Sequence, residues 1–296
     1  MPLRPRMPPE PRWWQKLLRK PPTVALALGS GGARGLAHIP VLEALDELGI
    51  KPVAIAGASI GAVIGSGYAA GMSGREIRAY AEETLFKRSD VVRRVMSLQF
   101  EDVRKRFTES RSLRGLLAQL NAAAIAEEFL PQKVPQLFED LRIPLYVVTT
   151  DVWNRVERII HSGSLRSAVA GSMAIPGVLH PVLHDNRLLI DGGTVNPLPF
   201  DTLRHTADVI VAVDITRSIE CAEGTIPSPI DALFLALDIM THTIVSGRLQ
   251  MSAPDILLRP EVGSFGSLDF LRAAEILKAS EPIKEELKRR LSELLG

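Results

Sequence analysis

Cysteine is nearly absent from this sequence, because Cys221 is the only one among 296 residues. An intramolecular disulfide is therefore excluded, and the composition is typical of a protein from a reducing compartment. We expect Cys221 to be a small, packed, apolar side chain.

An excess of one charge and a long apolar run are missing as well. The formal net charge is +1, so nothing in the overall field favours nucleic acid, and we expect no nucleic acid partner. No apolar run approaches the ~18 residues of a membrane span. Prolines and arginines stand where the apolar part of a signal peptide would be. We therefore expect a cytoplasmic protein, and contact with the inner membrane surface stays open.

The composition is otherwise that of a globular protein, with 46% hydrophobic and 23% charged residues. A chain of this length can bury a full core. Residues 1–22 differ because they are rich in proline and in basic residues, which predicts an arm outside the domain. We predict one α/β domain over residues 23–296, with a helical insertion at about 87–141 and a helical tail at about 229–296.

Two segments combine apolar and basic residues in a pattern typical of contact with a membrane surface. In the arm, Trp13 and Trp14 precede leucines and basic residues, and residues 87–107 interleave apolar side chains with lysines and arginines. Each segment has an alternative interpretation. The tryptophans of the arm would then pack on the protein or on a second subunit, and 87–107 would be a helix packed on the domain. The oligomeric state stays open.

A strand, a loop, a helix and a second strand begin the predicted domain. The apolar run Thr23–Leu28 predicts a buried strand, and apolar residues recur at helical spacing from Leu36 to Leu48. A short apolar run, Val53–Ala56, follows. Such a unit implies parallel strands joined by a right-handed crossover. We therefore predict a parallel-rich central sheet sandwiched by helices.

Later segments extend this pattern. Strands are predicted at residues 144–151, 156–161, 188–190 and 208–215. Helices are predicted at residues 165–173 and 229–249 and at the C-terminus, where Ile283, Leu287, Leu291 and Leu294 are spaced for one apolar face.

The second strand leads directly into Gly57-Ala58-Ser59-Ile60-Gly61, which opens a helix of small residues. A strand, G-x-S-x-G and a helix form the setting of a nucleophile elbow. Neighbours of the serine must lack bulk in so tight a turn, and the helix N-terminus directs backbone N–H groups outward. This setting predicts that Ser59 is a nucleophile.

The loop Gly29-Ser30-Gly31-Gly32-Ala33-Arg34-Gly35 follows the first strand and has three interpretations. A dinucleotide site needs an acidic residue at the end of the second strand, where this sequence has Gly57-Ala58-Ser59. A P-loop needs a Lys-Ser/Thr pair that is missing at the required spacing. An oxyanion hole uses successive N–H groups at a helix N-terminus. This third interpretation also explains why the loop lies one strand away from Ser59.

A serine hydroxyl needs a positioned base. A hydrolase with the order Ser, Asp, His would have to use His205 or His242, since only these histidines follow Asp191. His205 is predicted at a solvated helix end and His242 within an apolar helix. Asp191 ends a short strand, and Gly192-Gly193 after it permit close backbone approach to a ligand. The alternative for Asp191 is a simple Asp-Gly turn.

These three motifs, in this order, resemble those of the patatin-like phospholipases. The chain is especially similar to short bacterial members that resemble the esterase domain of neuropathy target esterase, from about Thr23 to Ile215. The resemblance implies a Ser59–Asp191 dyad that works without histidine. Ser59 would attack an acyl ester while Asp191 takes its proton, and Asp191 would later activate the water that releases the fatty acid.

The resemblance also implies roles for the loop. The N–H groups of Gly31 and Gly32 would hold the oxyanion, and Arg34 would brace the loop or meet the lipid phosphate. Ser30 stands where many members have a glycine, which requires a negative φ at that position. The substrate would be a phospholipid or lysophospholipid, with neither a metal nor another cofactor.

The primary hypothesis is therefore a serine lipid acyl hydrolase. Two alternatives stay open. One is a Ser-His-Asp α/β-hydrolase or acyltransferase, and the other is a non-catalytic lipid-binding protein in which the Ser59 region holds a head group. The sequence identifies neither the head group nor the acyl position.

Overall fold

The structure is a computed structural model that describes residues 22–87, 121–216, 226 and 229–295. The predicted arm with Trp13 and Trp14 lies outside the described residues, as does Cys221. Most of the predicted insertion, including all of 88–107, lies outside them too.

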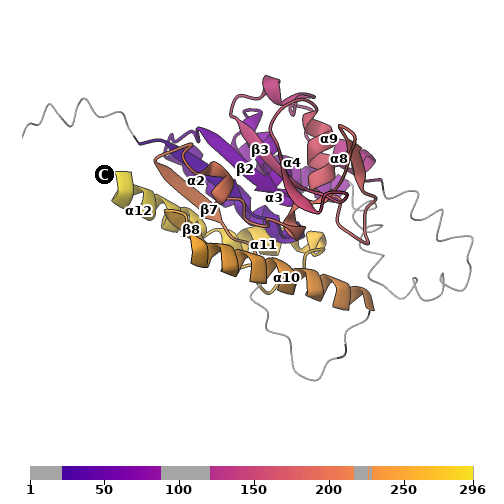
Figure 1. The fold of residues 1–296 in the computed structure, drawn as a ribbon. Helices are drawn as coiled ribbons and strands as arrows, with labels where there is room; N and C mark the ends of the chain where they lie inside the picture. Colours follow the sequence, from indigo (N-terminus) through magenta and orange to yellow (C-terminus); the bar gives the residue numbers. More distant parts are fainter. Residues whose placement is uncertain (1–21, 88–120, 217–225, 227–228, 296) are drawn as a thin grey trace, which may run out of the picture.

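Eight strands form one mixed, mostly parallel sheet with the order β5-β6-β3-β2-β1-β7-β8, and β4 pairs with β3 (Figure 1). The strands β3, β2, β1, β7 and β8 are parallel to one another, whereas β4, β6 and β5 join through antiparallel pairs. The predicted fold class is confirmed. The bounds are β1 (Val24–Leu28), β2 (Ala54–Ala58), β3 (Leu145–Asp151), β4 (Val156–Ile160), β5 (Val182–His184), β6 (Arg187–Asp191), β7 (Val209–Val213) and β8 (Ile256–Leu258).

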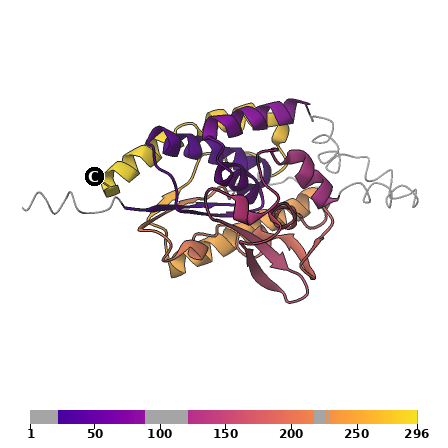
Figure 2. The ribbon, with the colours of Figure 1, turned by 90° about the horizontal axis from the view of Figure 1, so that it is seen from above.

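The two faces of the sheet differ in the size of their side chains. In β1, Leu26 and Leu28 join the larger apolar core, whereas Ala25 and Ala27 point into a smaller core on the opposite face. Alternation along a strand produces this division. Helices cover both faces, so the protein has three layers (Figure 2).

Among the described residues, seven helices lie over the larger core. They are α2 (His38–Glu47), α3 (Ile60–Ala69), α4 (Gly74–Lys87), α8 (Ala122–Phe129), α9 (Leu165–Ser172), α11 (Ala273–Ser280) and α12 (Ile283–Leu295). In α12, Ile283, Leu287 and Leu291 are buried as the predicted apolar face requires. Leu294, predicted on the same face, lies in the last turn and is 52% exposed.

A capping box begins α4. The Ser73 hydroxyl accepts a hydrogen bond from Glu76 N–H (3.2 Å), and the Glu76 carboxylate accepts one from Ser73 N–H (2.8 Å). This reciprocal pair satisfies two N–H groups that the helix would otherwise leave unpaired.

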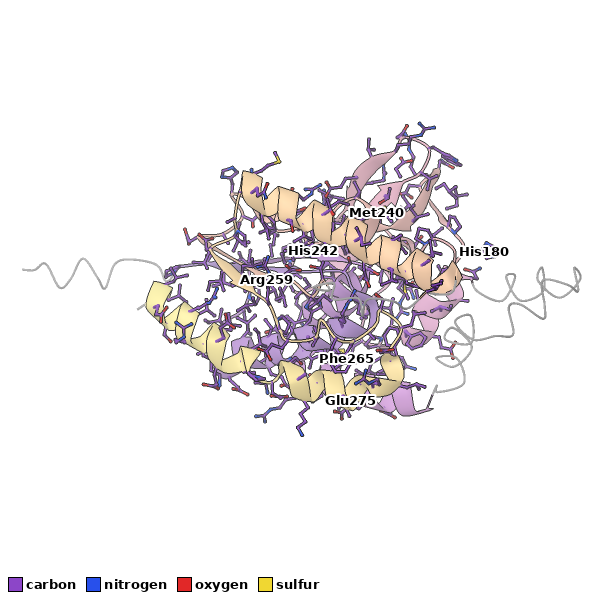
Figure 3. All side chains as sticks on the ribbon, turned by 90° about the horizontal axis from the view of Figure 1, so that it is seen from below. His180, Met240, His242, Arg259, Phe265 and Glu275 are labelled. Carbon is purple, nitrogen blue, oxygen red and sulfur yellow. The ribbon has the colours of Figure 1, made fainter. Side chains whose placement is uncertain are left out.

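The smaller core is covered by α10 (Pro229–Met251). Its segment Ala232–Met251 is long and apolar enough to cross a membrane by length and composition, and only 11% of that window is buried. The expectation that no segment reaches this length is therefore wrong, because isolated polar residues break the apolar run without making the helix polar. Met240 and His242 lie on the exposed side of α10, which crosses the face seen in Figure 3.

Three local features differ from the predictions. The strands β5 and β8 were not predicted, because three residues are too few to show a strand pattern. The helix expected from Leu36 begins earlier, as the 3-10 turn η1 (Gly32–Ala37), and continues as α2.

Glu43 of α2 ties three helices together. Its buried carboxylate accepts two hydrogen bonds from Arg78 of α4, at 2.6 and 2.7 Å, and contacts Lys284 of α12. A buried carboxylate requires such partners to offset its loss of water.

We predict that Glu43→Gln lowers the free energy of unfolding by about 1–3 kcal/mol, because both cations then lose their shared partner. Urea denaturation measures this change. The matched control is Glu285→Gln, which removes an exposed ion pair with Lys288 and should change stability by less than about 0.5 kcal/mol. Equal effects from the two variants would contradict the proposed role of Glu43.

Candidate active site

Ser59 stands at a sharp turn between β2 and α3. Its φ is 53° and its ψ is −122°, a conformation that costs energy for a residue other than glycine and is typical of functional sites. A Cβ on Gly57 would lie 2.6 Å from the carbonyl of Gly61, and one on Gly61 would lie 2.2 Å from Leu28 O. The two glycines of the motif are therefore required by the close contacts of strand, turn and helix.

The backbone of Ser59 is tied to the neighbouring strand through Ser172 at the end of α9. Ser59 N–H donates to Ser172 Oγ (2.9 Å), and this hydroxyl donates to Val148 O of β3 (2.6 Å). Ser172 was not predicted from the sequence. A serine at a helix end is common, so no local signal distinguished it.

Ser59 and Asp191 meet through the register of the sheet. Ala58 pairs with Val148, and Asp191 pairs with Thr149, the next residue of β3. Asp191 therefore comes level with Ser59, although β6 runs antiparallel to β3. Ser59 Oγ donates to Asp191 Oδ2 at 2.6 Å.

The two glycines after Asp191 allow this approach. A Cβ on Gly192 would lie 2.0 Å from Val148 O, so only glycine lets the chain pass this close to β3. Gly193 N–H donates to Asp191 Oδ1 (2.7 Å) and so orients the carboxylate. A Cβ on Gly193 would lie 2.6 Å from Ser30 Oγ, which places the Ser30 side chain beside this turn.

The surroundings of Asp191 change its acidity. The residue is only 6% exposed. Burial raises the pKa of Asp191 to about 6, while the hydrogen bonds from Ser59 and Gly193 act in the opposite direction. A carboxylate with this pKa is ionised at neutral pH and is a better proton acceptor than an ordinary aspartate.

The glycine-rich loop leaves two adjacent N–H groups without a partner. Gly29 donates to Val213 O (3.1 Å), Ser30 to Pro197 O (2.8 Å) and Ala33 to Ser267 O (2.8 Å). Within the described part of the chain, the N–H groups of Gly31 and Gly32 donate no hydrogen bond. These are the two groups predicted to hold an oxyanion.

The shape of the loop explains two other residues of the motif. Gly32 has a φ of 58°, and a Cβ there would lie 2.0 Å from Ser267 O, so this position requires glycine. A Cβ on Gly35 would lie 2.3 Å from Ile60 Cγ1, where α3 begins. Ser30 is not among the residues with positive φ, so its substitution for glycine introduces no strain.

Arg34 braces this loop from within the protein. The residue is 1% exposed, and its guanidinium donates to Asp238 Oδ1 (2.6 Å), Ser267 Oγ (3.0 Å) and Gly31 O (3.3 Å). Because its donors are directed to protein acceptors, the geometry favours the bracing role over contact with a lipid phosphate. Asp238 belongs to α10, more than 200 residues away, and was not predicted from the sequence.

The histidines lie away from the serine. His38 is buried beneath the loop and contacts Gly29 O through Nε2 (2.8 Å), and its burial lowers its pKa to about 4. Of the residues that the structure describes, no histidine lines either cavity that contains Ser59. His205 and His242 thus do not occupy the place of a catalytic base. The same residues contain no cluster of His, Cys, Asp and Glu that could hold a metal ion.

Two cavities meet at Ser59. The larger, of about 170 Å³, is lined mainly by apolar residues of α3, α4 and α8 and of the segment after α9. The smaller, of about 60 Å³, contains Asp191 and several hydroxyl groups. Ser59 and Gly32 line both cavities, so the nucleophile lies where the apolar cavity meets the smaller cavity, whose lining includes both polar and apolar residues.

Similar sequences were found among curated proteins. A protein of Mycobacterium tuberculosis described as an uncharacterised NTE family protein is 39% identical over 204 residues, which cover 67% of this chain and 50% of that protein. Human patatin-like phospholipase domain-containing protein 6 is 36% identical over 196 residues, which cover 65% of this chain and 13% of the human protein. The matched part of this chain thus spans half or less of these relatives.

Two solved structures resemble the fold. VipD from Legionella pneumophila has a TM-score of 0.46 and 14% identity, over 92% of this chain and 67% of VipD. ExoU from Pseudomonas aeruginosa, in a structure of its complex with SpcU, has a TM-score of 0.43 and 16% identity, over 94% of this chain and 53% of that chain.

A family model described as "Patatin-like phospholipase" matches residues 26–204. This range begins in β1, includes the glycine-rich loop and the serine turn, and extends beyond Asp191. It covers more than half of the 296 residues, and the resemblance predicted from the three motifs is confirmed. The chain belongs to the patatin-like phospholipase family.

Proposed function

We propose that this protein is a serine lipid acyl hydrolase that cleaves a phospholipid or lysophospholipid with Ser59 as nucleophile and Asp191 as base. The observation that carries the proposal is the 2.6 Å hydrogen bond from Ser59 Oγ to Asp191 Oδ2. This bond lies at the junction of the two cavities, beside two unpaired N–H groups.

In the first half of the reaction, Ser59 Oγ attacks the carbonyl carbon of the ester and its proton passes to Asp191. The N–H groups of Gly31 and Gly32 stabilise the negative charge on the carbonyl oxygen. The tetrahedral intermediate then collapses, the bond to the alcohol breaks, and the leaving oxygen takes the proton from Asp191. An acyl group remains on Ser59.

In the second half, a water molecule gives a proton to Asp191 and its oxygen attacks the acyl carbon. The bond to Ser59 Oγ breaks, Ser59 recovers the proton from Asp191, and the fatty acid leaves. The carboxylate thus serves as base and then as acid in each half, as microscopic reversibility requires.

The cavities support a lipid as substrate. A hydrocarbon chain gains free energy when it leaves water for the apolar cavity. The smaller cavity has four hydroxyl-bearing residues besides Ser59 in its lining, Ser30, Thr194, Thr241 and Ser267, and suits the alcohol side of the ester. Arg34 also lines this cavity, but its pairing with Asp238 leaves it as a support of the loop.

We predict that Ser59→Ala and Asp191→Asn each lower kcat/KM for ester hydrolysis by about 10³-fold or more, because nucleophile and base act as a unit. Assays with lysophosphatidylcholine and p-nitrophenyl butyrate measure this loss. Asp185→Asn is the matched control, since Asp185 is an exposed aspartate outside both cavities. A fluorophosphonate probe should label the wild-type protein and leave Ser59→Ala unlabelled.

Other outcomes would favour an alternative function. Full activity in Asp191→Asn would remove the dyad from the mechanism. A protein that binds lysolipid but neither reacts with the probe nor hydrolyses an ester would be the non-catalytic lipid binder.

The pH dependence follows from the raised pKa of Asp191. Only the ionised carboxylate can accept the proton of Ser59. Because burial raises the pKa to about 6, kcat/KM should be constant above that pH and fall about tenfold per unit below it. This decrease of kcat/KM at acid pH should persist in His205→Gln and His242→Gln. Loss of this decrease in either variant would support a histidine base instead.

The brace between Arg34 and Asp238 gives another prediction. Asp238→Asn should reduce kcat by about tenfold or more with little change in KM, because the loop that presents the oxyanion donors loses its ionic support. Steady-state kinetics separate the two constants. Asp201→Asn is the matched control, since it removes a different ion pair of α10, with Arg248, outside both cavities. Equal losses in the two variants would assign Asp238 a general structural role.

A further inference from the structure

One face of α3 forms a wall of the apolar cavity. Ile60, Val63, Ile64 and Gly67 line the cavity, and their spacing places them on one side of a helix. Ser59 directly precedes α3. The wall therefore leads away from the nucleophile along the helix, and the eight steps from Ser59 to Gly67 span about 12 Å at 1.5 Å per residue.

The helix α4 supplies a second wall with the same periodicity. Its cavity-lining residues are Ile77, Tyr80, Ala81, Thr84 and Leu85. The connection between the two helices covers residues 70–73, so Gly67 and Ile77 are the lining residues of α3 and α4 nearest to it. Ala69 O accepts hydrogen bonds from Arg142 N–H (2.9 Å) and Ile143 N–H (3.2 Å) beside this connection. Gly67 is thus the cavity-lining residue of α3 that lies furthest along the helix from Ser59.

The chemistry and volume of the cavity match a hydrocarbon chain. Its walls are almost entirely apolar, with Ser59, Tyr80 and Thr84 as the hydroxyl-bearing residues. An engineered apolar cavity of about 150 Å³ holds a molecule of benzene, so a cavity of about 170 Å³ has room for part of one acyl chain. Two chains side by side would not fit.

The fold does not explain the glycine at position 67. A Cβ there would lie 3.6 Å from both Ile77 Cγ1 and Met72 Sδ, which is ordinary contact. By contrast, a Cβ on Gly61 would clash with Leu28 O, and one on Gly65 would lie 3.2 Å from Ile55 Cγ2. Glycine is also less favourable than alanine inside a helix. The space at Gly67 is therefore available to a ligand at the expense of helix stability.

We propose that the apolar cavity binds one acyl chain whose carbonyl lies at Ser59, and that Gly67 sets the length of chain that fits. The chain runs along α3 from the nucleophile toward the connection with α4. Chains longer than the cavity must leave part of their hydrocarbon outside it. This inference rests on the ester hydrolysis proposed above.

The test is a series of p-nitrophenyl esters from butyrate through octanoate, decanoate and laurate to palmitate, with the full chain. In Gly67→Leu, the side chain occupies the part of the cavity furthest along α3 from Ser59, so kcat/KM for laurate relative to butyrate should fall by about tenfold or more, as expected when a pocket loses room for several methylenes. Gly67→Ala should shift the profile in the same direction by a smaller factor. If Gly67→Leu does not fold, the chain-length profile of Gly67→Ala tests the inference instead.

A matched control is available in α10. Gly247 also lies inside a helix, a Cβ there would meet no atom within 4 Å, and the residue is outside both cavities. Gly67→Ala and Gly247→Ala should both raise the melting temperature, because alanine is favoured in helices. Only Gly67→Ala should change the chain-length profile.

A binding measurement separates this inference from the proposed function. In the Ser59→Ala background, displacement of a fluorescent fatty acid by octanoate, laurate and palmitate reports binding without catalysis. Gly67→Leu should weaken binding of laurate more than that of octanoate. An active enzyme with an unchanged chain-length profile in both Gly67 variants would overturn the inference alone. Inactivity on every ester, with the length-dependent binding retained, would overturn the hydrolase proposal alone.

Discussion

The hydrogen bond between Ser59 and Asp191 is the interaction on which the rest of the site depends. It requires a carboxylate that has lost most of its water, and burial alone favours the protonated form of that group. The hydroxyl of Ser59 and the N–H of Gly193 replace part of the lost hydration. The resulting pKa of about 6 leaves the group charged at neutral pH and still basic enough to accept a proton. A shift in the register of β6 against β3 would move Asp191 away from Ser59, and the carboxylate would lose the hydrogen bond that offsets part of the effect of burial on its pKa.

The sequence predicted the parts of the site that local backbone geometry dictates. Gly61 and Gly192 have no room for a Cβ, and such constraints leave recognisable glycine patterns beside Ser59 and Asp191. The parallel strands around β1 were predicted for a similar reason, since continuous apolar runs are typical of strands buried on both faces. The motifs therefore indicated the residues that meet, without indicating how they meet.

The remaining features depend on contacts between distant segments. Asp191 arrives on an antiparallel strand, and only the pairing of β6 with β3 brings it level with Ser59. Ser172 and Asp238 were missed because a helix-end serine and a lone acidic residue in an apolar helix carry no motif. The apolar cavity depends on how α3, α4 and α8 lie together, and the periodicity of one helix does not reveal that arrangement.

The ion pair between Arg34 and Asp238 joins the motif-bearing part of the protein to its tail. Arg34 lies inside the region that the family model matches, residues 26–204, and Asp238 lies beyond it. A fragment that ends at residue 204 would retain Ser59, Asp191 and the loop with its free N–H groups. In that fragment the buried guanidinium of Arg34 would have lost its anionic partner. The unit that holds the site together is therefore larger than the matched region, because one charge of this buried pair lies on α10, some two hundred positions after the loop that it supports.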